Sequence, residues 1–192
     1  AGFSLMVAAN NLVMLFLGLE VGSIALYVLA GLARERRESE EAAIKYFLLG
    51  SFASAVFIYG VALIYAGTGS FEILGIRQHL NDFVISSPAV IYIGIGLVVA
   101  GLGFKVSAAP FHTWAPDVYQ GAPAGLVGYM AAVAKVAGFA AIARILLTAF
   151  SDLADTWLPV VAGISVLSMV LGSVLALVQG DVRRLLAYSG VA

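Results

Sequence analysis

The chain has 192 residues, of which 62% are hydrophobic and only 11% are charged. Soluble domains have about 45–50% apolar and about 25% charged residues, so we expect this protein to be folded in lipid. The net charge of −1 excludes a nucleic-acid-binding protein with a basic face, and the absence of cysteine excludes disulfides, thiolate metal sites, iron–sulfur clusters and a cysteine nucleophile.

Five stretches are long and apolar enough to span a bilayer, which takes about 20 residues of helix. They do not alternate as barrel strands would, so we expect an all-α, polytopic transmembrane bundle. Pro110 predicts that the third stretch is broken near 105–110, because one helix over its length would measure about 50 Å. The expected spans are 12–32, 42–66, 88–120, 124–149 and 157–178, with partial spans at 1–9 and 182–192. Together they form one membrane domain (1–192), which we interpret as an internal fragment of a longer protein.

The connections between spans divide the basic residues unevenly. Five arginines lie in 33–41 and 179–184, whereas 67–87 and 150–156 hold one between them. The positive-inside rule therefore predicts that 33–41 and 179–184 are cytoplasmic, together with 107–123. Residues 67–87 mix apolar and polar side chains in a pattern typical of a short amphipathic helix at the membrane interface.

Three ionisable residues are predicted to be buried within the spans, where each costs about 2.5–3.5 kcal/mol at a helix centre and is expected to have a function. Glu20 lies near the middle of the first span, between Gly18 and Gly22, which allow close helix approach. Lys105 lies at the predicted break, and Lys135 lies too deep in the fourth span to reach water easily. Because burial disfavours a charged amine, both lysines can release protons, and we predict three proton sites. For Glu20 a structural polar contact between helices remains the alternative, and for Lys105 an amine that reaches the interface from a helix end.

Two further residues are candidate proton relays. Lys45 begins the second span, where an amine that simply reaches the interface is an equal alternative. His112 titrates near neutral pH but suits a structural hydrogen bond equally well. Two separated histidines without cysteine do not form a metal cluster, and no nucleophile–base pair is visible, so we predict no metal site and no catalytic residue. The aromatic residues that suit interfacial belts are Tyr27, Trp114, Tyr119 and Trp157.

Residues 110–123 read Pro-Phe-His-Thr-Trp-Ala-Pro-Asp-Val-Tyr-Gln-Gly-Ala-Pro, which resembles the hallmark of the antiporter-like membrane subunits of respiratory complex I. The sequences of 117–123 and 135–139 resemble the N type of these subunits of NADH-quinone oxidoreductase most closely. One departure is Ala124-Gly125, where the family usually has Thr-Pro. Further agreement lies in 15–20, 45–50 and 181–189.

This resemblance implies a proton-translocating subunit with part of an inverted-repeat, antiporter-like fold. It implies that Glu20 pairs with Lys105, and that Lys135 takes the proton next when quinone is reduced elsewhere in the complex. It implies no redox site or cofactor on this chain, although the whole complex would use NADH, FMN, iron–sulfur clusters and quinone. The implied partners are adjacent antiporter-like and small membrane subunits, lipid and protons, not nucleic acid, in a bacterial-type inner membrane.

Two other functions fit parts of this pattern. A subunit of a multi-subunit cation/proton antiporter, or of a hydrogenase-related complex, would share the fold and the buried charges, but the N-type sequence at 117–123 argues against it. A purely structural membrane subunit would explain the spans, but it would not explain why Glu20, Lys105 and Lys135 lie in lipid.

Overall fold

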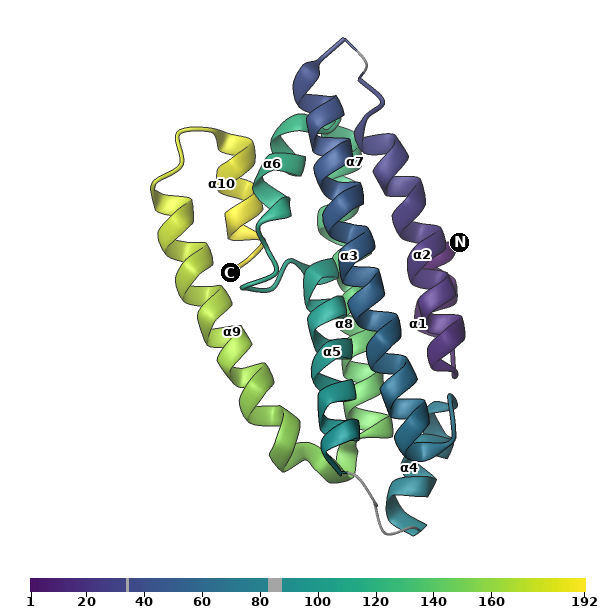
Figure 1. Ribbon diagram of the computed structural model, residues 1–192. Helices are drawn as coiled ribbons and strands as arrows, with labels where there is room; N and C mark the ends of the chain where they lie inside the picture. The colour runs from purple at the N-terminus through teal and green to yellow at the C-terminus, as the bar shows by residue number, and fades with distance from the viewer. Residues whose placement is uncertain (34, 83–87) are drawn as a thin grey trace.

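A computed structural model describes residues 1–33, 35–82 and 88–192, which form the expected all-α transmembrane bundle. Five helical stretches in these ranges are long and apolar enough to cross a membrane, and none of the described residues forms a strand. Figure 1 shows the long helices side by side, with α9 standing apart from the others. In chain order the α-helices are α1 (Gly2–Ala8), α2 (Leu12–Ala30), α3 (Arg37–Thr68), α4 (Ile73–Asp82), α5 (Pro88–Val106), α6 (Trp114–Gly121), α7 (Ala124–Tyr129), α8 (Lys135–Arg144), α9 (Ala154–Leu177) and α10 (Val182–Ser189).

Helices α1 and α2 pack backbone to backbone through glycine. A Cβ added at Gly18 would lie 2.5 Å from the backbone nitrogen of Met6, and one added at Gly2 would lie 2.4 Å from that of Gly22. The side chain of Asn11 caps the start of α2, which explains the polar break in this apolar part of the sequence.

Helix α3 begins at Arg37, before the predicted start at 42, so the end of the predicted charged connection is helical. Two acidic residues in its first turn interact favourably with the helix dipole. The hydroxyl of Ser39 donates a hydrogen bond to the carbonyl of Ala30 (2.7 Å), which joins the start of α3 to the end of α2. At about 1.5 Å per residue, its 32 residues extend beyond a ~30 Å hydrocarbon layer.

The third span is discontinuous, as predicted. Helix α5 ends at Val106, and α6 begins at Trp114. Ser107 has a left-handed backbone conformation (φ 61°), which stops α5 at this point. The amide of Ala109 donates to the hydroxyl of Ser168 on α9 (2.8 Å), so a backbone group freed by the break is satisfied by another helix.

The segment that joins α5 to α6 lies about midway along the molecule (Figure 1). Ser107 and Ala109 are fully buried there. Residues 107–123, which the sequence analysis groups with the cytoplasmic connections, are not a loop for most of their length, because the first part is packed inside the bundle and the second part is helix α6. The side of the membrane to which α6 belongs stays a prediction.

The fourth span is helical from Ala124 to Ala149 and contains two π-helical turns, at 130–134 and 145–149. The first π-helical turn ends directly before Lys135, the first residue of α8. Such turns insert an extra residue and are frequent at functional sites, because they redirect the side chains that follow.

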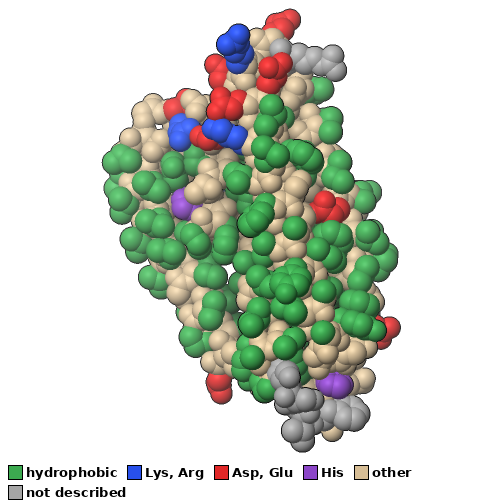
Figure 2. Space-filling model, in the orientation of Figure 1, with side chains coloured by type: hydrophobic (Ala, Val, Ile, Leu, Met, Phe, Trp, Pro, Cys, Tyr) green, Lys and Arg blue, Asp and Glu red, His purple; other side chains and the backbone are tan. Residues whose placement is uncertain are grey.

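Polar and charged residues gather at the ends of the bundle. Figure 2 shows apolar side chains over most of one face and a group of charged side chains at the end formed by the start of α3 and by α6 and α10. At the other end, α4 buries Ile73 and Ile76, as expected for the predicted amphipathic helix in 67–87. Residues 83–87 of that prediction lie outside the described residues.

Candidate functional site

Lys105 lies in the last turn of α5 and is only 4% exposed. Its amine donates hydrogen bonds to the hydroxyl of Ser23 on α2 (2.9 Å) and to that of Tyr46 on α3 (3.4 Å). It also lies 4.8 Å from the ring centroid of Phe3 on α1, a cation–π contact. Four helices therefore meet around one ammonium group, which is surrounded by hydroxyls and aromatic rings.

Glu20 lies one turn before Ser23 on α2 and is half-buried. Its carboxylate accepts a short hydrogen bond from the hydroxyl of Ser54 on α3. Among the described residues Glu20 and Lys105 form no direct ion pair, but they lie within range of a Coulombic interaction. A cavity of about 10 Å³, about the space that one water needs, lies between Ser23, Ser54 and Lys105. The resemblance implied that Glu20 pairs with Lys105. In the structure each of them contacts a serine instead, Ser54 and Ser23 respectively.

Lys135 begins α8 and is 8% exposed. Its amine donates to the carbonyl of Gly190, beside the end of α10, at 2.5 Å. A Cβ on Gly190 would lie 2.7 Å from that amine, so glycine allows this approach. A Cβ on Gly138 would lie 2.6 Å from a methyl carbon of Val106 and 3.6 Å from Cγ of Lys105. Helix α8 therefore packs directly on the end of α5, and the two buried lysines lie on neighbouring helices.

Three aromatic side chains, which we call the aromatic row, connect the surroundings of the two lysines: Tyr46, Trp114 and Tyr119. Tyr46 and Trp114 are stacked with ring centroids 4.6 Å apart, and Trp114 meets Tyr119 edge-on at 6.4 Å. The amine of Lys135 lies 6.0 Å from the ring centroid of Tyr119. The prediction that Trp114 and Tyr119 suit an interfacial belt is wrong for their surroundings, because both are 2% exposed and face other helices. Tyr27 and Trp157 are buried in the bundle as well.

Lys45 takes part in an ionic cluster at the charged end of the bundle. Its amine lies 2.7 Å from Asp117 of α6 and 2.6 Å from Glu41, and Arg184 of α10 lies 2.6 Å from the other oxygen of Asp117. Partial burial alone would raise the pKa of Asp117, but the hydrogen bonds from Lys45 and Arg184 hold this pKa below its usual value. With 41% of its side chain exposed, Lys45 is not brought to Lys105 or Lys135 by any contact of the described residues.

His112 lies in the segment between α5 and α6 and is 8% exposed. Its ring meets Tyr188 of α10 edge-on at 6.2 Å, and its Nδ1 has no hydrogen-bond partner among the described residues. It is therefore placed beside the break, but on the side of α10 rather than of α2 and α3. No signal in the sequence pointed to the hydroxyls that contact Lys105, because serine and tyrosine are common in membrane helices.

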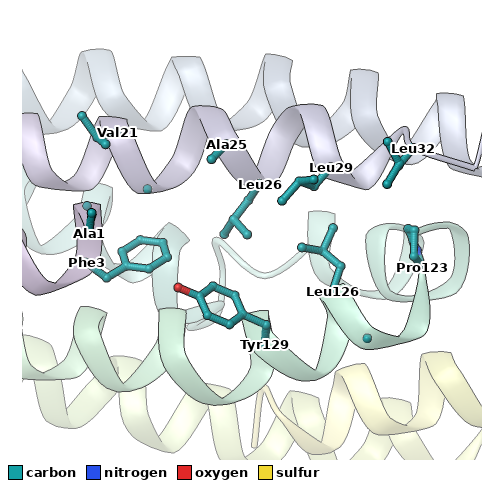
Figure 3. A pocket seen from close by; sticks show the side chains of 13 residues that line it. Ala1, Phe3, Val21, Ala25, Leu26, Leu29, Leu32, Pro123, Leu126 and Tyr129 are labelled. Carbon is teal, nitrogen blue, oxygen red and sulfur yellow. The ribbon is translucent and has the colours of Figure 1, made fainter.

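An apolar pocket of about 570 Å³ lies away from these charges, between α1, α2 and α7. Figure 3 shows Phe3, Leu26 and Leu126 on its walls, with Tyr129 reaching across it. Its lining lacks acidic, basic and histidine side chains. Phe3 is shared by this pocket and by the surroundings of Lys105.

Sequence comparison finds proteins that are similar to this chain over its whole length. Proteins named NADH-quinone oxidoreductase subunit N from Parafrankia sp. (strain EAN1pec) and Mycobacterium tuberculosis (strain ATCC 25618 / H37Rv) are 49% and 50% identical to the whole chain, which covers 37% and 36% of their lengths. The chain thus spans little more than a third of the curated relatives that it matches. These names agree with the N-type resemblance of 117–123.

Solved structures have the same fold. A structure titled respiratory complex I from Thermus thermophilus with bound aureothin matches all of this chain and 40% of the other, with a TM-score of 0.83 and 40% identity. The Mrp complex from Dietzia sp. DQ12-45-1b matches 99% of this chain and 35% of the other, with a TM-score of 0.88, and at 23% identity it shows the fold alone. The family described as NADH:quinone oxidoreductase/Mrp antiporter, TM, matches residues 9–192. The chain is therefore an integral membrane protein and belongs to the NADH:quinone oxidoreductase/Mrp antiporter transmembrane family.

Proposed function

We propose that this chain is the part of an N-type subunit of an NADH:quinone oxidoreductase that moves protons across a bacterial inner membrane. Lys105 carries the proposal, because it is buried at the end of an interrupted helix among hydroxyls and aromatic rings. An ionisable group at such a depth is costly and marks an ion pathway by default. The relatives named subunit N and the similarity to a complex I structure support the identity of the larger complex.

Glu20, Lys105 and Lys135 are the proposed proton sites. While Glu20 is ionised, its charge stabilises the ammonium form of Lys105. When Glu20 is neutralised or moves away, the buried amine of Lys105 releases its proton more readily, because burial favours the neutral form. Lys135 on the adjoining helix then receives the proton. The small cavity between Ser23 and Ser54 has room for the water that would connect Glu20 to Lys105.

The location and the partners belong to the same proposal. The end of the bundle that carries Lys45, Arg183 and Arg184 faces the cytoplasm, as the positive-inside rule predicts. The partners are adjacent antiporter-like and small membrane subunits of the complex. The redox chemistry takes place on other subunits, which hold FMN, iron–sulfur clusters and quinone, and this chain contributes the protein groups that hold and move protons.

The test uses Lys105→Met and Lys135→Met in the full-length subunit, within the assembled complex in inverted membrane vesicles. Methionine keeps much of the length of each side chain and removes its proton-binding group. We expect normal assembly and a fall of at least about tenfold in proton uptake, since positioned proton-transfer groups contribute about 10²–10⁴-fold. NADH oxidation coupled to quinone is recorded in the same vesicles.

The matched control is Arg77→Met, which removes a cation from an exposed ion pair with Asp152 at the other end of the bundle. Proton uptake in this variant should equal that of the unmodified complex. If both lysine variants pump at the unmodified rate, these lysines are packing residues and the structural alternative is correct.

A further inference from the structure

The aromatic row runs from one buried lysine to the other. At one end the amine of Lys105 donates to the hydroxyl of Tyr46 (3.4 Å), and at the other the amine of Lys135 lies 6.0 Å from the ring centroid of Tyr119. Trp114 joins the two tyrosines through a stacked contact at 4.6 Å and an edge contact at 6.4 Å. The row therefore lies between two groups that, in the proposed function, exchange a proton.

The hydrogen bonds of the row are unevenly satisfied. Trp114 donates its indole N–H to the carbonyl of Phe104 (2.9 Å), and the hydroxyl of Tyr46 is engaged by Lys105. The hydroxyl of Tyr119 is buried and has no hydrogen-bond partner among the described residues. A buried hydroxyl left unpaired costs about 1–3 kcal/mol, so phenylalanine would be the more stable residue if only packing mattered. Tyr119 therefore has a free protic group at a site where a ring alone would suffice.

The position of this hydroxyl is well defined. Tyr119 lies on α6, two residues after Asp117, whose carboxylate is held by Lys45 and Arg184. These contacts tie α6 to α3 and α10. The ring of Tyr119 is thus fixed between the end of the row that faces Lys105 and the amine of Lys135.

We infer that Tyr119 is a further residue of the proton path, and that its hydroxyl relays protons between Lys105 and Lys135. The inference rests on the proposed function. The phenol oxygen accepts a proton from the side of Lys105, by way of Tyr46 and bound water, while its own O–H proton passes through water to the amine of Lys135. Lys105 loses one proton, Lys135 gains one, and the phenol is neutral before and after the transfer.

The decisive variant is Tyr119→Phe in the full-length subunit of the assembled complex. It keeps the ring over Lys135 and the contact with Trp114, and it removes one oxygen that has no partner. We expect unchanged amounts of assembled complex and a fall of about tenfold or more in proton uptake by vesicles. The matched control is Tyr59→Phe, which removes a hydroxyl from a residue of α3 that is 60% exposed, and should leave proton uptake unchanged.

A second variant, Tyr119→His, separates a protic role from a structural one. Histidine is smaller than tyrosine but can accept and donate a proton, so proton uptake should be several-fold higher than in Tyr119→Phe. Unchanged proton uptake in Tyr119→Phe would overturn the inference, and so would an equal loss in both variants, which would show that a protic side chain at this position does not restore proton uptake. Loss of assembly in Tyr119→Phe would also overturn it, because the hydroxyl would then be a structural partner.

Lys135→Met, measured in parallel, separates this inference from the proposed function. If Lys135→Met stops proton uptake and Tyr119→Phe does not, the proposed function stands and Tyr119 has no part in it. If neither variant changes proton uptake, the proposed function fails together with the inference.

Discussion

Asp117 joins three helices through one carboxylate, and its neutralisation should loosen α6. Its two oxygens lie 2.7 Å from the amine of Lys45 and 2.6 Å from the guanidinium of Arg184. A hydrogen bond to a charged group contributes about 1.5–3 kcal/mol when shielded, and an exposed ion pair contributes about 0.2–1 kcal/mol. Because about a third of each of the Asp117 and Arg184 side chains is exposed, we expect Asp117→Asn to cost about 2 kcal/mol for the two contacts together.

The assay is hydrogen exchange of residues 114–121 and 182–189 in the purified, full-length complex. Local opening of a helix sets the exchange rate of its amides, and each 1.4 kcal/mol changes that rate about tenfold. We therefore expect exchange in α6 and α10 to be about 25-fold faster in Asp117→Asn. The matched control is Asp152→Asn, which removes a single contact of 3.2 Å whose side chains are 43% and 46% exposed, and should change exchange less than about fivefold.

An equal change in Asp117→Asn and Asp152→Asn would refute this reasoning. It would mean that the two contacts of Asp117 contribute no net free energy, and that α6 is held by the packing of Trp114 and Tyr119 instead. A large change in exchange that spreads over all helices would also contradict it, because the ionic cluster lies at one end of the bundle (Figure 2).

Three other predictions follow from the packing and from the ionic cluster. Gly18→Ala should lower the free energy of unfolding by about 1–3 kcal/mol, because the added Cβ would lie 2.5 Å from a backbone nitrogen. Gly96→Ala should raise the free energy of unfolding by about 0.5–1 kcal/mol, because the added Cβ would have nothing within 4 Å. Thermal unfolding of the complex distinguishes the two variants. Gly190→Ala should displace the amine of Lys135 and lower proton uptake several-fold without loss of assembly, and unchanged uptake would show that this contact is dispensable. Folding lowers the pKa of Asp117, so its contribution to stability is present above the ordinary pKa of aspartate and is lost as the pH falls through the lowered value. In Asp117→Asn the unfolding temperature should therefore fall less steeply with decreasing pH in the acidic range.

Hydrophobicity alone was enough to predict the transmembrane architecture. Each span had to be a long apolar helix, because lipid offers no hydrogen bonds to the backbone. The break in the third span was predicted from Pro110 and from the length of that span. The proline is the stronger of these two signals, because α3 has 32 residues and is continuous. The exact ends were less predictable, because α3 extends past its apolar part into Arg37, where helix formation depends on charges in the first turn.

The candidate site was predictable in part. Glu20, Lys105 and Lys135 could be named from the sequence, because placing an ionisable residue in lipid costs free energy and such a residue inside an apolar run can be recognised from the sequence alone. Lys45 and Asp117 were harder to interpret. They are 72 positions apart in the chain, and their ion pair exists because α6 returns to the start of α3.

The sequence by itself determined that this protein lies in a membrane, that it is helical, and which charges it buries, since these properties depend on the transfer of side chains from water to lipid. The tertiary structure alone decided what each buried charge contacts. Ser23, Tyr46 and Phe3 come to Lys105 from three other helices, and Tyr119 reaches Lys135 because α6 folds back against α10. Contacts of this kind depend on glycine-mediated helix crossings and on the turn at Ser107, and their partners lie too far apart in sequence for any local pattern to pair them.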